Sequence, residues 1–317
     1  MYKKICVIGE GITSLIVTRV LLDLNLEIDL VSESFFSSKK YDNRSLAISY
    51  SNFEYLKNLK ILDKKNHTWK INEINLFNAK NNQNISKIFD FKNRQNKPLF
   101  IMAGYKNLVL DLKEKIVKNS SLKIYSKKIA KKIIKDLTIH NIKSSYNYSL
   151  VINCNNSNII NNKFFNKKIK KSYFSVSFTS IINHKNIKNE IASQFFMNQG
   201  PMAFLPLSNS KTFVIWSVNE KHLSNKNKIN YSLFKKQIKK NVENNLQIIS
   251  LSKINQFNLH FMVPREYYYE NILSFGEALH QVHPLSGQGL NMIIRDIKLL
   301  NYIIKFSRYN FIILITF

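Results

Sequence analysis

The sequence predicts an α/β fold in which a parallel sheet is followed by a second, mainly antiparallel sheet. Residues 5–8 form a short apolar run, a glycine-containing turn follows, and residues 15–24 are apolar at helical spacing. Residues 26–31 read as a second strand, which completes the strand, turn, helix, strand unit that opens many parallel sheets. In the middle of the chain, residues 173–182 alternate apolar and polar side chains, as a half-buried antiparallel strand does.

The remaining segments fit this scheme in order. Helices are expected over residues 51–62 and 108–117, and strands over residues 71–77, 85–91 and 150–152. The antiparallel sheet continues through residues 202–207, 212–218 and 256–263, with a lysine-rich helix over residues 231–246 between them. Residues 272–275 read as a buried parallel strand, which leads into a glycine-rich segment and a helix over residues 290–304.

Composition narrows the class of protein. The chain has 317 residues, 44% of them hydrophobic, which is enough for two packed domains. Cys6 and Cys154 are far apart, so we expect neither a disulfide framework nor a cysteine-based metal site. The formal charge of +28 would suit a polyanion, but the lysines are spread along the chain among Asn and Ile. Because no segment interleaves aromatic residues with Arg, we expect no nucleic-acid site.

The two ends of the chain bear on its location. Gly9 interrupts the first apolar run too early for a signal peptide. Residues 310–317 are mostly apolar but far fewer than the roughly 20 that span a bilayer. We expect a cytoplasmic protein, with peripheral contact to the inner membrane surface left open.

The turn after the first apolar run has the pattern GxGxxG with Ser14 in the third position, beginning at Gly9 and Gly11. Gly9 allows a tight turn, Gly11 lets backbone approach a pyrophosphate, and the following helix directs its positive end at the phosphates. Ser14 is small enough to keep helix and strand close. The pattern predicts a dinucleotide site, and an ordinary glycine turn is the alternative.

Two charged residues follow the second predicted strand. A dinucleotide site needs a carboxylate for the ribose hydroxyls roughly 20 residues after the glycines, and Glu33 fits this position. Arg44 is a candidate partner for a phosphate or a flavin edge, because its fork of donors suits anions. The alternative for both residues is a plain surface position.

The segment from Phe275 to Asn291 contains the strongest motif. A strand ends in Gly276 and Glu277, and a glycine-rich loop that begins at Pro284 then opens a helix. Such a loop presents backbone N–H groups to an electron-rich group, so it predicts a second cofactor loop; a helix start that happens to be glycine-rich is the alternative. His280 and His283 are three residues apart, but no convergent third ligand is evident and we predict no metal site.

This segment resembles the GDAAH…HP…GQGxN signature of the flavoprotein aromatic hydroxylases, particularly the branch that hydroxylates polyprenylated phenols on the way to ubiquinone. Residues 200–207 and 214–216 are similar to the GPxAxLPL and VxW block of that branch. Asp42 and Arg44, with Ala47 and Ser49, look like its DxRxxAxS motif. The matches run in the family's order from Gly9 to Asp296.

The resemblance implies an FAD-binding Rossmann-like domain of the para-hydroxybenzoate hydroxylase type, built from residues 1–70, 100–165 and 265–317. Residues 71–99 and 166–264 would form an inserted antiparallel-sheet domain for the substrate. Gly9, Gly11 and Glu33 would hold the ADP half of FAD, and Gly276 with Glu277 would approach the pyrophosphate and ribityl chain. The isoalloxazine would be surrounded by Pro284, Gly287, Gln288, Gly289, Leu290 and Asn291.

Three departures from the family pattern stand out. The family's Gly-Asp is Gly276-Glu277 here, a longer acid that can still reach a ribityl hydroxyl. Its mid-chain Asp-Gly motif corresponds to residues 155–157, which are Asn, Asn and Ser. The family also continues beyond the GQGxN helix, whereas this sequence ends at Phe317, so we expect the C-terminal helical part to be truncated.

The function implied is an FAD-dependent monooxygenase that uses NAD(P)H and dioxygen, through a flavin hydroperoxide, to hydroxylate an aromatic ring such as a polyprenyl phenol. No side chain is predicted as an acid or base. Phe204 and Trp216 either line an apolar pocket or pack in the core. Alternatives for the whole chain are another FAD oxidoreductase of this fold, or a catalytically impaired accessory protein that binds FAD, or nothing, within a biosynthetic complex.

Overall fold

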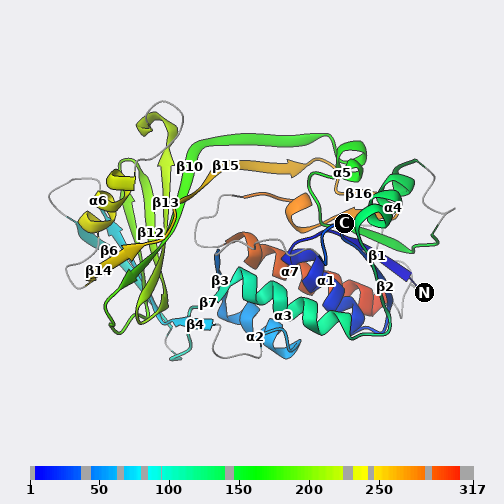
Figure 1. The fold of residues 1–317 in the computed structure, drawn as a ribbon, viewed down its shortest axis with the longest axis horizontal. Coiled ribbons are helices and arrows are strands. Elements are labelled where there is room, and N and C mark those ends of the chain that lie inside the picture. Colours follow the sequence, from blue (N-terminus) through cyan, green and yellow to red (C-terminus); the bar gives the residue numbers. More distant parts are fainter. Residues whose placement is uncertain are drawn as a thin grey trace.

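The computed structural model describes residues 4–36, 44–62, 68–79, 85–93, 95–139, 146–223, 231–241, 246–282 and 288–307, and Figure 1 shows their arrangement. A mainly parallel sheet and a large, mainly antiparallel sheet lie at opposite ends of the long axis. A small sheet lies between them, next to the helices that cover the parallel sheet. The expected α/β fold is confirmed.

The parallel sheet is built on β1 (Lys4–Ile8), which pairs with β2 (Glu27–Val31) on one side and β9 (Leu150–Asn153) on the other. Its order is β16-β17-β9-β1-β2-β8, with β8 (Leu122–Tyr125), β17 (Ile272–Ser274) and β16 (Tyr268–Tyr269) completing it. β16 is antiparallel to β17. Residues in β1 are buried on both faces, which explains why their sequence is continuously apolar.

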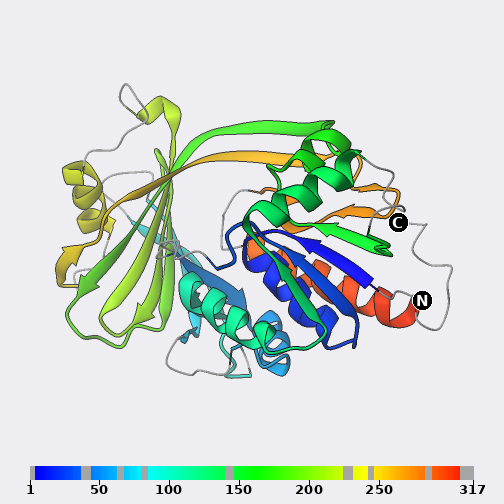
Figure 2. The ribbon, with the colours of Figure 1, turned by 45° about the vertical axis from the view of Figure 1, so that its right-hand side comes forward.

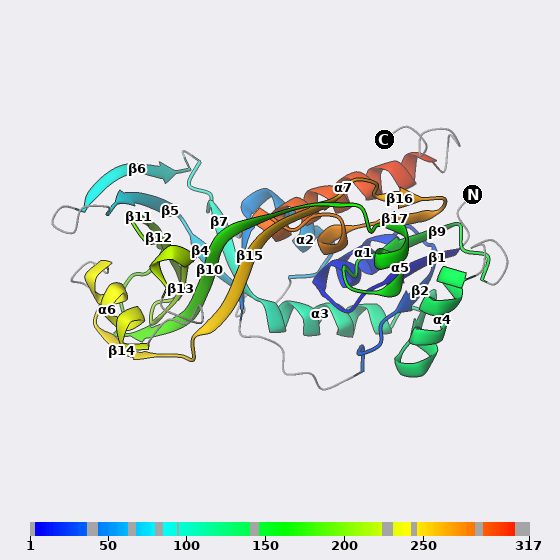
Figure 3. The same cartoon turned by 90° about the horizontal axis from the view of Figure 1, so that it is seen from above.

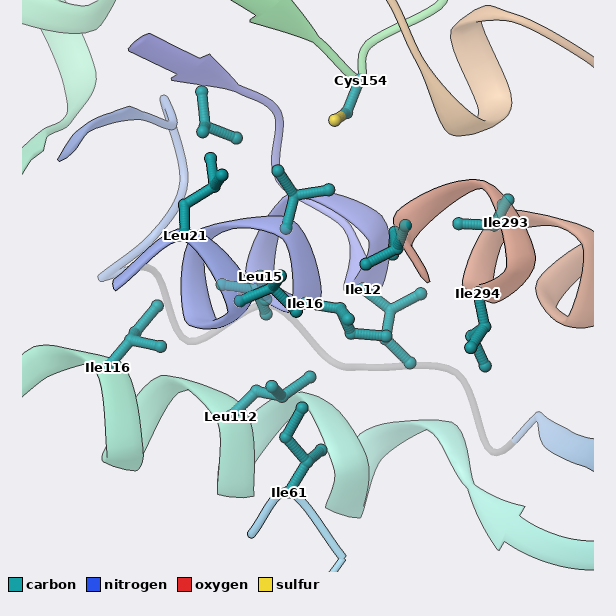
Figure 4. Packing of buried hydrophobic residues seen from close by; sticks show 14 of the residues in the cluster. Ile12, Leu15, Ile16, Leu21, Ile61, Leu112, Ile116, Cys154, Ile293 and Ile294 are labelled. Carbon is teal, nitrogen blue, oxygen red and sulfur yellow. The ribbon is translucent and has the colours of Figure 1, made fainter. Parts of the chain in front are cut away.

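Helices cover both faces of this sheet. α1 (Ile12–Leu22), α3 (Tyr105–Val117) and α7 (Gln288–Ser307) pack with Ile5 and Val7 in one core, together with α2 (Tyr50–Asn58). Figure 4 shows Ile12, Leu15 and Ile16 of α1 between α3 and α7. The opposite face, which includes Cys6 and Ile8, is covered by α4 (Lys127–Ile139) and α5 (Ile159–Phe164).

The small sheet has the order β3-β7-β4, with β3 (Ser45–Ser49), β7 (Phe100–Gly104) and β4 (Thr68–Ile71) all antiparallel. The large sheet runs β14-β10-β13-β12-β11-β5-β6, and β15 (Asn255–Pro264) also pairs with β10. Its strands are β5 (Glu73–Asn78), β6 (Ser86–Lys92), β10 (Lys168–His184), β11 (Ile191–Met197), β12 (Gly200–Ser208), β13 (Lys211–Asn219) and β14 (Ile248–Leu251).

α6 (Tyr231–Asn241) covers the outer face of the large sheet, where Phe234 and Ile238 are fully buried. β10 and β15 form a long two-stranded ribbon that reaches from this sheet back to the parallel sheet (Figures 1 and 3). The turned view in Figure 2 shows the small sheet and α3 below this ribbon. Among the described residues, no helix is long and apolar enough to cross a membrane.

Several elements differ from the sequence-based expectation. β10 extends to 17 residues because both of its ends pair with β15 or β14. The expected strand 71–77 is divided at Asn72 into β4 and β5, which belong to different sheets. The short elements β3, β7, β8 and α5 were not predicted, because they are stabilised by pairing and packing with distant segments and their local periodicity carries little signal. The 13-residue helix α4 was also not predicted, although its buried residues Ala130, Ile133, Ile134 and Leu137 have helical spacing.

Candidate functional site

The first glycine turn lies at the carboxyl end of β1. Gly9 has a φ of 153°, and a Cβ there would lie 3.1 Å from the Cβ atoms of Cys154 and Ser14. Ser14 is fully buried, and its hydroxyl donates to the Gly11 carbonyl at 2.8 Å. The small residues at these positions therefore allow α1 to begin close against the sheet.

Gly11 is the N-cap of α1, and its position is open. A Cβ at Gly11 would meet the Tyr105 hydroxyl at 3.9 Å and nothing nearer. The helix start has no side-chain capping hydrogen bond and no acidic residue in its first turn. The backbone N–H groups there are available to an anion, which the helix dipole also favours.

The second glycine turn contacts the first. Gly276 has a φ of 61°, in the left-handed region, and a Cβ there would lie 2.4 Å from Thr13 Cγ2 in the first turn of α1. The preceding residue, Phe275, donates its backbone N–H to the Asn153 carbonyl at 2.9 Å, at the end of β9. Two turns more than 260 residues apart in sequence thus meet at one edge of the parallel sheet.

A cavity of about 500 Å³ extends from this junction toward the large sheet. This volume lies within the usual range for small-molecule and cofactor sites. The wall toward the helices includes Ile12, Arg44, Tyr105, Glu277, Gly289 and Leu290. The wall toward the large sheet includes Ser177, Thr179, Leu205, Phe213, Ile215 and Phe257.

Four of the expected cofactor residues line this cavity. Arg44 lies with its guanidinium carbon 4.7 Å from the centre of the Tyr105 ring, and its carbonyl accepts from the Tyr105 N–H at 2.9 Å. Glu277 follows Gly276 in a short 3₁₀ turn (Gly276–Ala278). Among the described residues, no atom lies within 4 Å of where a Cβ of Gly289 would stand, and Leu290 lies beside Gly289 in α7.

Other expected residues lie elsewhere. Glu33 follows β2 on the surface, and its carboxylate lies 3.7 Å from Lys131 Nζ. Asn291 faces the small sheet: its side chain accepts from the Ser49 N–H at 2.8 Å and donates to the Ala47 carbonyl at 2.8 Å. Gln288 is the first residue of α7. Pro284 and Gly287, together with Asp42 and His283, lie outside the described residues.

The site also contains residues to which the sequence analysis gave no cofactor role. Tyr105 lies beside both Gly11 and Arg44, but a single tyrosine before a predicted helix carries no signal of its own. His280 lines the cavity, and its Nε2 lies 2.8 Å from Asp296 Oδ2, one element further along the chain. Among the residues the structure places, no group of His, Cys, Asp and Glu could hold a metal ion.

The buried thiol beside the junction is neutral. Burial raises the pKa of Cys154, and the charge of Glu277 raises that pKa further. Cys154 therefore adds no negative charge next to the anion-binding start of α1.

A smaller chamber of about 60 Å³ adjoins the cavity, since Ala47, Leu205 and Ile215 line both. Its other walls are mostly apolar and include Ile71, Ile74, Met102 and Ala203.

Of the two alternatives for Phe204 and Trp216, the structure shows packing in the core. They are 7% and 2% exposed and belong to the core under α6. Trp216 lies 6.1 Å from the Phe234 ring. Successive residues of a strand point to opposite faces, so their neighbours Ala203, Leu205, Ile215 and Ser217 face the chamber instead.

Known proteins resemble this chain in part of its sequence and in its fold. Residues 160–305 match the model of the FAD binding domain. The chain is therefore similar to FAD-dependent aromatic monooxygenases in this part of its sequence and in its fold. Its fold matches PqsL of Pseudomonas aeruginosa with a TM-score of 0.74 at 12% identity, covering 99% of this chain and 89% of PqsL. The match to p-nitrophenol 4-monooxygenase PnpA of Pseudomonas putida DLL-E4 has a TM-score of 0.71 at 12% identity, over 95% and 79% of the two chains.

Proteins similar to this chain in sequence include enzymes named for ubiquinone biosynthesis. Ubiquinone biosynthesis monooxygenase COQ6 of Xenopus tropicalis is 26% identical over 38% of this chain and 34% of the relative. The 3-demethoxyubiquinol 3-hydroxylase of Escherichia coli is 28% identical over 34% of this chain and 27% of the relative. The chain thus spans about a third of the length of these relatives. COQ6 of Caenorhabditis elegans is 23% identical over 86% of this chain and 70% of the relative.

The residues around the two glycine turns fit FAD, the cofactor of the proteins that this chain resembles. The uncapped start of α1 suits the pyrophosphate, and the open positions at Gly11 and Gly289 leave room that a side chain would fill. Residues 155–157, which stand where the flavoprotein aromatic hydroxylases have Asp-Gly, form hydrogen bonds with neighbouring residues of the same segment. Asn153 Oδ1 accepts from the Asn155 N–H at 3.3 Å and from Asn158 Nδ2 at 2.8 Å, while Asn155 Oδ1 accepts from the Ser157 N–H at 2.9 Å.

Proposed function

We propose that this protein is an FAD-dependent monooxygenase that hydroxylates the ring of a phenol carrying a polyprenyl chain, as a step of ubiquinone biosynthesis. One oxygen atom of dioxygen enters the ring and the other leaves as water, while NAD(P)H supplies two electrons and becomes NAD(P)⁺. The names of the relatives support the ubiquinone assignment.

The observation that carries the proposal is the contact between the two glycine turns. Gly276 and Thr13 touch, and the cavity that begins there has room beyond the anion-binding start of α1. One extended ligand can therefore hold its phosphates at α1 and its ring system beside α7.

FAD supplies the redox chemistry, and the protein supplies binding and orientation. The first N–H groups of α1 donate to the pyrophosphate. Glu277 lines the cavity next to Gly276 and accepts from a hydroxyl of the ribityl chain. Glu33 accepts from the adenosine ribose; its ion pair with Lys131 is long and exposed, so it opposes this bond weakly.

The far end of the cavity orients the flavin ring and the substrate. The open backbone at Gly289 and the start of α7 favour negative charge on the flavin ring, because the positive end of the helix dipole points there. Arg44, held over Tyr105, adds a positive charge on the same wall. The sheet wall of Leu205, Phe213 and Ile215 is apolar and keeps water from the reacting ring.

The location and the domain division belong to the same proposal. Residues 1–70, 100–165 and 265–317 serve as the FAD-binding domain, and residues 71–99 and 166–264 as the substrate domain. The protein works in the cytoplasm at the inner membrane surface, where its charge of +28 favours anionic lipids and where a polyprenyl phenol resides.

The test is a visible absorption spectrum of the purified protein, followed by an NAD(P)H oxidation assay with and without a prenylated phenol. We expect flavin bands, and donor oxidation that depends on the phenol and yields hydroxylated product. A protein unable to retain added FAD would refute the proposal and favour the accessory role. Donor oxidation that ignores the phenol would favour another FAD oxidoreductase of this fold.

A further inference from the structure

The face of the large sheet that lines the chamber continues beyond it to the surface of the molecule. Cross-strand partners in a sheet share a face, so the pairing registers trace which side chains lie in one row. Ile215 of β13 pairs with Ala203 of β12, and Ala203 pairs with Gln194 of β11. All three line the chamber.

The same row of side chains continues on β5, beyond the residues that line the chamber. Gln194 pairs with Leu76, and Ala192 pairs with Ile74, which still lines the chamber. Leu76 does not line it and is half-buried. Apart from Gln194, the row between the cavity and β5 is apolar.

The row ends in two exposed phenylalanines on β6. Ile74 pairs with Phe91 and Leu76 with Phe89, so both rings share the face of the chamber. Phe89 is 55% exposed and Phe91 47% exposed, and their ring centres are 4.7 Å apart. The opposite face of the same strands carries charges instead, including Glu73 with Lys87 and Lys92.

We propose that this row is the path of the substrate's apolar tail, from the ring in the large cavity, through the chamber, to Phe89 and Phe91 at the edge of the sheet. The inference rests on the proposed function and adds to it the residues that make the binding affinity depend on the length of the tail.

The size of the chamber indicates that its occupant is the tail of the substrate and not the ring. A cavity that holds benzene measures about 150 Å³, so a chamber of about 60 Å³ excludes the ring and admits a narrow chain. The ring must then lie in the cavity of about 500 Å³, next to the flavin site. Three strand spacings separate β12 from β6, which is a path of roughly 14 Å.

The experiment measures binding by calorimetry, on the FAD-loaded protein, of phenol, 2-geranylphenol and 2-farnesylphenol. In the unmodified protein we expect affinity to rise along this series. The double variant Phe89→Ser/Phe91→Ser should bind phenol within twofold of the unmodified protein and farnesylphenol about tenfold more weakly. Tenfold corresponds to about 1.4 kcal/mol, or the burial of roughly 60 Å² of apolar surface.

Two further variants complete the design. Phe36→Ser/Phe174→Ser removes two rings that are 65% and 64% exposed and lie off this row, so it should leave the series unchanged. Ala203→Leu fills the chamber and should abolish the gain from the tail while FAD content, measured by absorbance, stays the same. Trp69 packs against the apolar residues of the chamber, so its fluorescence gives a second readout of tail binding.

The outcomes separate the two proposals. If FAD and phenol bind but affinity ignores tail length, the tail path is wrong and the hydroxylase proposal stands. If the β6 variant changes the oligomeric mass in solution while keeping the tail dependence, the phenylalanines are a contact between copies and the path is again wrong. If the unmodified protein binds neither FAD nor phenol, both proposals fail.

Discussion

Replacing Gly276 with alanine tests the contact between the two glycine turns. The new Cβ would stand 2.4 Å from Thr13 Cγ2, and the backbone there has a φ of 61°. Thr13 is 4% exposed and lies in the first turn of α1, so its methyl group has little room to move away.

The expected loss has two parts. A non-glycine residue in the left-handed region costs about 1–2 kcal/mol. Overpacking a buried site costs about 1–3 kcal/mol more. The free energy of unfolding should therefore fall by about 2–5 kcal/mol, a large part of the 5–15 kcal/mol typical of a folded protein.

Urea denaturation of four proteins separates the two parts: the unmodified chain, Gly276→Ala, Thr13→Ala and the double variant. Removing the Thr13 methyl and hydroxyl groups relieves the clash but leaves the backbone strain. We expect the double variant to recover about 1–3 kcal/mol relative to the sum of the single variants. A double variant whose losses simply add would refute the reasoning, because the two turns would then not be in contact.

Four other changes test the site and its support. Gly11→Leu should abolish FAD retention, seen as loss of the flavin bands. The free energy of unfolding should change little, because the Tyr105 hydroxyl is the only atom of the described residues within 4 Å of the new Cβ. Gly289→Ala should raise the unfolding free energy by about 0.5–1 kcal/mol, since no atom of the part of the chain that the structure describes lies within 4 Å of the new Cβ, yet weaken FAD binding in a fluorescence titration. Asp29→Asn should lower the free energy of unfolding by about 2–3 kcal/mol in urea denaturation. Asp29 is 2% exposed, accepts a hydrogen bond from the Tyr148 hydroxyl and forms an ion pair with Lys4. The loss stays below that of a fully buried pair because Lys4 can still reach water. Burial raises the pKa of the Cys6 and Cys154 thiols above that of unfolded thiols, which begin to ionise at about pH 8.5. The contribution of these two thiols to stability should therefore be constant below about pH 8.5 and fall as pH rises above it.

Each of these has a contrary result. Normal flavin retention in Gly11→Leu would remove the first turn from the site, and unchanged FAD affinity in Gly289→Ala would remove the start of α7. An Asp29→Asn protein as stable as the unmodified chain would show that the buried carboxylate makes no net contribution to the free energy of unfolding. For the pH prediction, the variant Cys6→Ala/Cys154→Ala should lose less stability between pH 7 and pH 10; an equal loss would assign the effect to other groups.

The local patterns of the sequence were sufficient for the parallel core. Residues 5–8 are continuously apolar, the glycines follow directly, and the next helix and strand have clear periods, so β1, α1 and β2 could be predicted. The motif from Gly276 to Asn291 likewise identified the second turn. These features depend on residues close in sequence, where spacing alone reports the local conformation.

The tertiary structure decided the features that depend on distant pairing. Residues 71–77 look like one strand, but Asn72 separates two sheets because β4 pairs with β7 while β5 pairs with β11. Asn291 bonds to β3, more than 240 residues away, and His280 meets Asp296 of α7 although 15 residues separate them in the sequence. Which face of β12 and β13 lines the chamber was equally open, because alternation shows that two faces exist but not which one the helix α6 covers.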